Sequence, residues 1–286
     1  MKRIAQQSLR IVRQILFAAV FAILFWTTLA MIFENKFIYF PSSYSQSEYV
    51  PAATVPGLQD CWFTAEDGIK LHGWYLPADS PRATLIISHG NAGNIAHRLI
   101  LLKGYQRAGF NVMMYDYRGY GRSEGSPSEE GIYADGRAAY DHTLMLKGVD
   151  SNKIILWGTS LGGAVAVDVA LHRKAAGLIL ESAFSSARDV AKAAYPFLPV
   201  YLTLHTKLNS IDKIPQVHVP LLAMHGNHDS VIPFSLGRKL YASANEPKEF
   251  YIIEGADHND TYFIGGNEYL QKVQAFATRL GASVSR

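Results

Sequence analysis

The sequence holds one cysteine, Cys61, among its 286 residues. A lone thiol excludes an internal disulfide and a zinc cluster built on thiolates, and it says little about the redox compartment. Cys61 is followed by Trp62 and Phe63 in a strand-like stretch. We therefore interpret it as a small buried hydrophobic residue rather than a nucleophile.

The chain also lacks a strong excess of charge of either sign, since its formal net charge is only +3. Four basic residues, Lys2, Arg3, Arg10 and Arg13, stand near the N-terminus with no acidic residue among them, so the rest of the chain is close to neutral. Nucleic-acid binding requires a basic face. We therefore expect no nucleic-acid partner.

Charge is absent from residues 14–33, which read QILFAAVFAILFWTTLAMIF. At about 1.5 Å per residue, a helix of this length crosses the roughly 30 Å hydrocarbon core of a bilayer. The alternative is a cleaved signal peptide, whose apolar part usually has about 7–15 residues and ends at a small-residue site. Thr28-Leu29-Ala30 matches such a site poorly. We predict a basic cytoplasmic tail at 1–13 and a single transmembrane anchor at 14–33, and the positive-inside rule then puts the body of the chain on the extracytoplasmic side.

After the anchor we expect a connecting segment at 34–57 and one domain at 58–286, in which short apolar strands alternate with helices. The strand patterns lie at 61–64, 70–75, 84–88, 111–115, 153–157, 178–180, 221–225 and 250–253, and the helix patterns at 97–108, 129–146, 161–172 and 267–280. Such alternation is typical of an α/β fold whose mainly parallel sheet has helices on both faces. Residues 182–216 interrupt the pattern as either a crossover with a long loop or a cap over a site, and the sequence favours neither.

The strand pattern at 153–157 leads directly into Gly158-Thr159-Ser160-Leu161-Gly162, which fits the motif G-x-S-x-G. An apolar helix pattern follows. Between a strand and a helix, this motif makes a sharp turn that presents the serine hydroxyl above the sheet edge and needs small residues on either side. The pattern predicts that Ser160 is a catalytic nucleophile.

A serine nucleophile needs a base, and the base needs an acid that orients it. In this kind of fold the chain order is serine, acid, histidine, and the side chains gather beyond the carboxyl ends of parallel strands. Asp229 stands just after the strand pattern at 221–225, and His258 stands just after the pattern at 250–253. We predict that these two residues complete a catalytic triad.

Other residues near these positions admit a second interpretation, a metal site. His225 and His228 flank a turn rather than one face of a helix, and no glutamate pairs with them. We therefore predict no metal ligand and no cofactor. Asp257 and Asp260, on either side of His258, are interpreted as solvated loop acids.

The stretch SHGNAGN, residues 88–94, begins at the end of the apolar strand pattern at 84–88. A phosphate-binding loop would need the pattern G-x-G-x-x-G or G-x-x-x-x-G-K. Here the glycines are only Gly90 and Gly93, and no lysine follows them. We interpret them as turning backbone amides toward a developing negative charge. The side chain of Asn91 could also line the pocket, a question that the sequence leaves open.

Together these stretches resemble the α/β-hydrolase superfamily, and within it the α/β-hydrolase-domain proteins with a single N-terminal membrane anchor. The matching stretches are FIYFPSS, TAEDGIKLHGWYLP, SHGNAGN, MMYDYRGYGRSEGSPSEEG, WGTSLGG, HGNHDSVIP and GADHND. The resemblance implies an α/β-hydrolase fold with an eight-stranded-type sheet behind one transmembrane helix. It also implies a triad of Ser160, Asp229 and His258, and an oxyanion hole built from the backbone N–H groups of Leu161 and Asn91. Asp116 and Arg118 in DYRGYG are interpreted as residues that stabilise a turn.

The expected function is that of a membrane-anchored serine hydrolase that cleaves carboxylic esters or thioesters through an acyl-enzyme. Its partners would be a small-molecule acyl ester or a lipid substrate and, through the N-terminal helix, the membrane; the sequence assigns no oligomeric state. A serine peptidase of the prolyl-peptidase-like type is an alternative, although such enzymes usually carry a large additional domain. The other alternative is a membrane-tethered interaction protein that keeps the fold without the activity.

Overall fold

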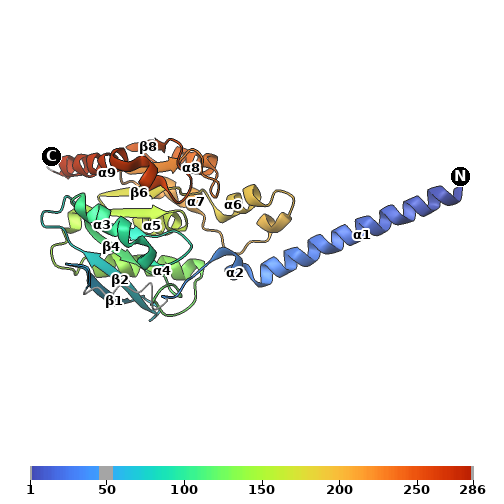
Figure 1. Ribbon diagram of the computed structural model, residues 1–286, viewed down its shortest axis with the longest axis horizontal. Coiled ribbons are helices and arrows are strands. Elements are labelled where there is room, and N and C mark those ends of the chain that lie inside the picture. The colour runs from blue at the N-terminus through green and yellow to red at the C-terminus, as the bar shows by residue number, and fades with distance from the viewer. Residues whose placement is uncertain (1, 45–53, 285–286) are drawn as a thin grey trace.

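The computed structural model describes residues 2–44 and 54–284 of the chain. Residues 45–53, which belong to the predicted connecting segment, lie outside the described residues. Helix α1 (Lys2–Ile32) extends away from the body of the molecule (Figure 1). Within it, Gln6–Leu29 is long enough and apolar enough to cross a membrane.

One eight-stranded sheet forms the centre of the body, with the strand order β1-β2-β4-β3-β5-β6-β7-β8. The pairs β1–β2 and β2–β4 are antiparallel, and the remaining pairs are parallel. The strands are β1 (Gln59–Thr64), β2 (Lys70–Leu76), β3 (Thr84–Ser88), β4 (Asn111–Tyr115), β5 (Ile154–Thr159), β6 (Gly177–Glu181), β7 (Leu221–Gly226) and β8 (Lys248–Ile253). The predicted fold class, a mainly parallel eight-stranded sheet covered by helices, is confirmed.

Helices cover both faces of this sheet and divide the core into two layers. The first layer contains α4 (Glu129–Thr143), α5 (Leu161–His172) and α8 (Phe234–Ala242), and the second contains α3 (Leu99–Arg107) and α9 (Thr261–Val284). In β5, Ile154 and Leu156 pack in the first layer, whereas Ile155 and Trp157 pack in the second. Because both faces are buried, the strand sequences are apolar throughout rather than alternating. Cys61 is buried in the first layer, as predicted.

Several helices differ from the sequence patterns. Neither α2 (Glu34–Ile38) nor α8 was expected, and residues 182–216 fold into the short elements α6 (Ala187–Ala194), η4 (Pro199–Leu202), α7 (Ser210–Lys213) and η5 (Ile214–Gln216). The helix predicted at 267–280 is present as the second part of α9, and an unpredicted helical stretch at 261–265 precedes it across a kink at Gly266, which has a positive φ of 50°. This kink breaks the helical periodicity on which the prediction depended.

Residues 34–44, which we call the post-anchor segment, pack against the body. Tyr39 is only 2% exposed. Isolated parallel bridges join Pro41 to Gly93 and Ser43 to Gly121, so the segment lies across the loops that follow β3 and β4. The chain that leaves α1 therefore reaches the carboxyl edge of the sheet directly.

Candidate active site

Ser160 lies at the turn between β5 and α5 with φ 52° and ψ −116°. A side chain other than glycine rarely adopts a positive φ, and holding it there costs about 1–3 kcal/mol. The surroundings require the small residues of the motif. A Cβ on Gly158 would lie 2.2 Å from the carbonyl oxygen of Gly162, and a Cβ on Gly162 would lie 1.9 Å from that of Ser88. The strained turn predicted for a nucleophile is therefore present at Ser160.

Asp229 and His258 meet at the same edge of the sheet, where β7 and β8 end. The distance between Asp229 Oδ2 and His258 Nδ1 is 2.8 Å. The other carboxylate oxygen of Asp229 accepts the backbone N–H groups of Val231 and Ile232 at 3.0 and 2.7 Å. These bonds fix the carboxylate, and the carboxylate in turn fixes one nitrogen of the imidazole ring.

The environment of Asp229 keeps its carboxylate ionised. Burial alone would raise the pKa of this carboxyl group, but hydrogen bonds from His225 and His258, the charge interaction with His258 and the N–H of Ile232 together lower it well below its usual range. An ionised acid in contact with Nδ1 stabilises an imidazolium at His258. The pair is thus suited to accepting a proton at the other ring nitrogen.

Ser160 Oγ makes no hydrogen bond to the His258 ring among the residues that the structure describes. Such bonds are often long in an enzyme without substrate and shorten when the substrate is bound. The structure thus brings together the predicted acid and histidine, and it puts the predicted nucleophile on a neighbouring turn of the same sheet edge.

Two residues to which the sequence assigns no catalytic role support the acid and the histidine. His225, interpreted as a residue at the strand end, is buried and has its Nε2 3.1 Å from Asp229 Oδ2 and 3.1 Å from the carbonyl oxygen of Ile232. Asp257, interpreted as a solvated acid, accepts the N–H of His258 at 2.7 Å and both the N–H and the hydroxyl of Ser230. Asp257 therefore joins the loop of Asp229 to the loop of His258.

Glu181 at the end of β6 is a further supporting residue that sequence reasoning missed. Its carboxylate accepts hydrogen bonds from Trp157 and Thr159 on β5, and from Thr261 and Tyr269 on α9. Its carbonyl oxygen accepts the N–H of Ser160 at 2.9 Å. Glu181 thus connects the nucleophile turn to the helix that starts three residues after His258. The sequence signal that could have identified Glu181 is an acidic residue directly after an apolar strand pattern.

The loop after β3 passes close to Ser160, since a Cβ on Gly90 would lie 3.6 Å from that of Ser160. The guanidinium of Arg98 donates hydrogen bonds to the carbonyl oxygens of Gly90, Ala92 and Asn94. The Gly90 carbonyl oxygen also lies 2.6 Å from His89 Nδ1. Within one peptide plane the C=O and the following N–H point in opposite directions. The N–H of Asn91 therefore points away from Arg98 and His89.

The side chain of Asn91 contacts the post-anchor segment. Its oxygen accepts the N–H of Phe40 at 3.1 Å and the Tyr120 hydroxyl at 2.8 Å, and its nitrogen donates to the carbonyl oxygen of Ile38. Asp116 holds the same loop through the N–H of Ile95 at 2.9 Å. The Asn91 amide group, whose role the sequence leaves open, thus bonds the segment that follows α1.

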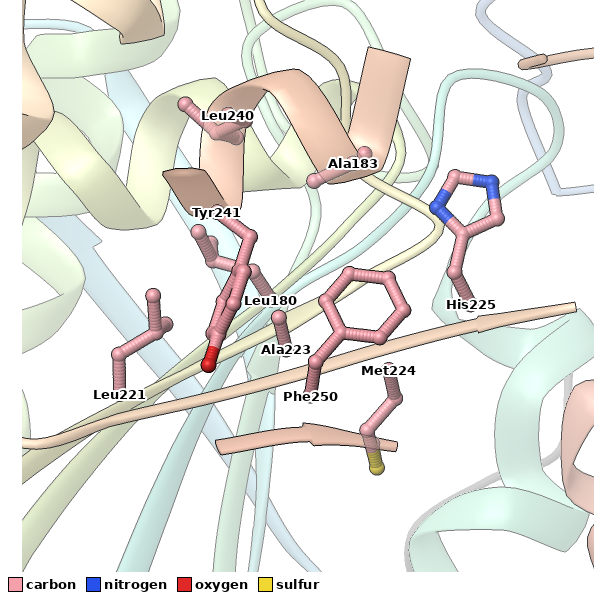
Figure 2. A pocket seen from close by; sticks show the side chains of 10 residues that line it. Leu180, Ala183, Leu221, Ala223, Met224, His225, Leu240, Tyr241 and Phe250 are labelled. Atoms are coloured by element: carbon pink, nitrogen blue, oxygen red, sulfur yellow. The ribbon is translucent and has the colours of Figure 1, made fainter. Parts of the chain in front are cut away.

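Two hollows found in the described part of the chain lie elsewhere. A small apolar cavity between β6, β7, β8 and α8 has Phe250 and Tyr241 in its wall and the His225 ring at its edge (Figure 2). Its volume of about 10 Å³ admits no more than one water molecule. A larger hollow of about 260 Å³ is lined by Arg82, Lys153 and Ala176, which precede β3, β5 and β6 and so lie at the opposite edge of the sheet. Neither hollow is a substrate pocket of the candidate site.

Known proteins share both the sequence and the fold. A family model described as "Serine aminopeptidase, S33" matches residues 79–211. An uncharacterized protein of Mycobacterium tuberculosis strain H37Rv, Rv2307c, is 37% identical over 86% of this chain and 87% of its own length. The alpha/beta hydrolase domain-containing protein WAV2 of Arabidopsis thaliana is 34% identical over 84% of this chain and 86% of its own length.

Among solved structures, the Pyrococcus furiosus esterase Pf2001 superposes with a TM-score of 0.70 and 20% identity, over 85% of this chain and 98% of that one. At this identity the likeness concerns the fold alone. The sheet order, the strained serine turn and the relatives agree on one class of protein. The chain belongs to the α/β-hydrolase family.

Proposed function

We propose that this protein is a membrane-anchored serine hydrolase that cleaves carboxylic esters or thioesters of acyl or lipid-like substrates. The observation that carries this proposal is the hydrogen-bonded pair of Asp229 and His258 at the sheet edge where Ser160 occupies its strained turn. Serine, acid and histidine are the groups that acyl transfer requires, and they occur in the chain order of this fold. The proposed reaction needs neither a metal nor a cofactor.

In the proposed mechanism His258 accepts the proton of Ser160 at Nε2 while Ser160 Oγ attacks the carbonyl carbon of the substrate. Asp229, hydrogen-bonded to Nδ1, keeps the ring in the required tautomer and stabilises the imidazolium. The same proton then passes to the leaving alcohol or thiol. Water, activated by His258 in turn, hydrolyses the acyl-enzyme and restores Ser160.

We assign the stabilisation of the negative charge on the tetrahedral intermediate to the backbone N–H groups of Leu161 and Asn91. Leu161 is the first residue of α5, where N–H groups have no partner within the helix. The carbonyl of Gly90, held by Arg98 and His89, supports the assignment of Asn91 because it turns that N–H in the opposite direction. A donor of this kind contributes about 3 kcal/mol to lowering the barrier.

The enzyme would prefer apolar acyl groups, because the insert at 182–216 is apolar and an apolar helix precedes the body. The anchor at 14–33 would keep the tail at 1–13 in the cytoplasm and the catalytic domain at 58–286 on the extracytoplasmic side. In this arrangement residues 182–216 act as a cap. A serine peptidase is the second candidate, and the observation in its favour is the description of the matching family model.

The test uses the full-length chain in detergent micelles. A serine-directed fluorophosphonate should label the protein, and Ser160→Ala should abolish both the labelling and the hydrolysis of p-nitrophenyl esters. Esters of increasing chain length report the size of the acyl site, and peptide p-nitroanilides test the second candidate. Labelling that persists in Ser160→Ala would exclude Ser160 as the nucleophile, and turnover of anilides without esters would favour the peptidase.

A further inference from the structure

The insert carries an apolar tip that the body does not cover. Phe197, Leu202 and Tyr195, which lie in the stretch from the end of α6 to η4, are 93%, 60% and 57% exposed. A large aromatic side chain with 93% exposure has almost no contact with its own fold. Exposed apolar groups that cluster in this way usually mark a surface that binds a partner or a membrane.

A second apolar group follows α1 in the chain. Phe33, Phe37 and Phe40 are 41%, 58% and 54% exposed. Helix α6 and the turns after it project from the body on the side where α1 leaves it (Figure 1), and η4 contacts α1. The insert tip and the start of the post-anchor segment therefore lie on one side of the molecule, next to the helix that is long enough to cross a membrane.

The exposed charged residues near these two apolar groups are basic, which suits binding to an anionic surface. Lys36, Arg188 and Lys192 are exposed. The nearby acids are engaged within the protein: Glu34 accepts the N–H groups of His205 and Thr206, and Asp189 pairs with Lys239 at 2.7 Å. Aromatic and basic side chains together are the composition of segments that lie in the headgroup region of a bilayer.

We propose that Phe33, Phe37, Phe40, Tyr195, Phe197 and Leu202, together called the aromatic rim, bind the surface of the bilayer that α1 crosses. The span in α1 keeps the rim within a short distance of that surface, so its binding is intramolecular in effect and needs little intrinsic affinity. The rim lies on the side of the carboxyl edge of the sheet, where Ser160 and His258 are. Rim binding therefore turns this edge toward the lipid, and acyl substrates enter from the bilayer.

This inference rests on the proposed anchor and deepens the proposed function, because it names the source of the substrate. A second copy of the chain or another protein could also cover an apolar surface. The lipid is favoured because the rim continues directly from the apolar helix and because its flanking charges suit lipid phosphates. The alternatives are outcomes of the test below.

The test measures lipid contact at one rim position in the full-length chain reconstituted in vesicles of phosphatidylcholine and phosphatidylglycerol. Phe197→Cys is labelled with an environment-sensitive fluorophore, and lipids with a spin label in the headgroup region or upper acyl chain act as quenchers. The native Cys61 is 5% exposed, and burial raises the pKa of its thiol to about 11, so the unsubstituted chain serves as the labelling control.

Met145→Cys is the matched position, because Met145 is an apolar residue with 76% exposure at the opposite edge of the sheet, near the start of β4. We expect strong quenching at position 197 and none at position 145. Equal quenching at both positions would overturn the proposal. So would quenching at 197 that appears only when the chain is diluted to one copy per vesicle, because another copy would then cover the rim at higher density.

A functional measurement separates this inference from the proposed function. Phe197→Glu should lower the turnover of a long-chain acyl ester embedded in vesicles by about tenfold or more, since it removes apolar contact with the interface. Turnover of a short water-soluble ester should fall much less, because this ester reaches the site without the bilayer. Failure of the unsubstituted chain to hydrolyse either ester would contradict the proposed function, while the quenching would still decide lipid contact. Equal loss on both esters would contradict entry of the substrate through the rim.

Discussion

The two halves of the candidate site are built in different ways. The half assigned to proton transfer lies within residues 225–261, where His258 bonds Asp229 and Asp257, and Asp257 also accepts the N–H of Ser230 on the neighbouring loop. The half assigned to the oxyanion uses the loop at 88–94, the post-anchor segment and Tyr120, whose positions in the sequence are far apart. The first half is thus complete within one part of the chain, whereas the second incorporates the segment that connects the body to the anchor.

This difference indicates that the segment after α1 and the body of the molecule are not independent units. Phe40 and Ile38 bond the side chain of Asn91, and Glu34 bonds the backbone of the insert at His205 and Thr206. A displacement of α1 relative to the body would therefore act on the oxyanion loop and on the insert before it reached the acid and the histidine. Substitutions in each half should then differ in what they change.

The largest loss of activity is expected from a substitution in the half assigned to proton transfer. Asp229→Asn keeps the size of the side chain but removes the charge and favours the wrong tautomer of His258, so kcat for ester hydrolysis should fall by about 10⁴-fold. Steady-state kinetics with a p-nitrophenyl ester measure this fall. Asp79→Asn, at an exposed position in the loop before β3, is the control and should leave kcat unchanged. A loss below tenfold in Asp229→Asn would show that Asp229 is not the orienting acid.

The three predicted triad residues could be found from the sequence because each stands in the loop or turn after an apolar strand. Ser160, Asp229 and His258 follow β5, β7 and β8, and the geometry of a parallel sheet brings such positions to one edge. The partners of Asn91 could not be predicted, because Phe40 is 51 residues away from it and no periodicity links the two. The same holds for Glu34, whose partner His205 is 171 residues away. Likewise α2, with five residues, is too short to produce a periodic pattern.

A smaller effect is expected from the half assigned to the oxyanion. Asn91→Ala keeps the backbone N–H but removes the bonds to Ile38, Phe40 and Tyr120. Loss of a complete oxyanion donor costs about 10²–10³-fold in kcat, so loss of its positioning should cost about tenfold, with KM little changed. Asn245→Ala is the matched control, because the Asn245 side chain also bonds two backbone carbonyls, those of Pro215 and Val217, away from the site.

A rise in KM without a change in kcat in Asn91→Ala would contradict the positioning role and assign the side chain to substrate binding. Tyr120→Phe provides a second measurement, since it removes one hydroxyl from the Asn91 oxygen and leaves the ring in place. It should lower kcat by less than Asn91→Ala does.

The smallest effect concerns stability, at the junction between the post-anchor segment and the insert. Burial opposes ionisation of Glu34, but hydrogen bonds from His205 and Thr206 outweigh it and hold the pKa of this carboxyl group below its usual value. Because the pKa is lower in the folded state than in the unfolded state, the ionised carboxylate stabilises the fold at neutral pH. This contribution is lost as the pH falls below the ordinary value for glutamate of about 4.3 and through the folded-state pKa.

Glu34→Gln should therefore lower the free energy of unfolding by about 2 kcal/mol at pH 7, the usual contribution of hydrogen bonds to a charged group. The difference from the unsubstituted chain should shrink as the pH falls from 5 to 3. Thermal unfolding of both full-length chains in detergent measures it, with Glu246→Gln, on the loop before β8, as the control. A difference that stays constant over this pH range would mean that the charge of Glu34 does not hold the insert. The link between the anchor and the insert would then depend on packing alone.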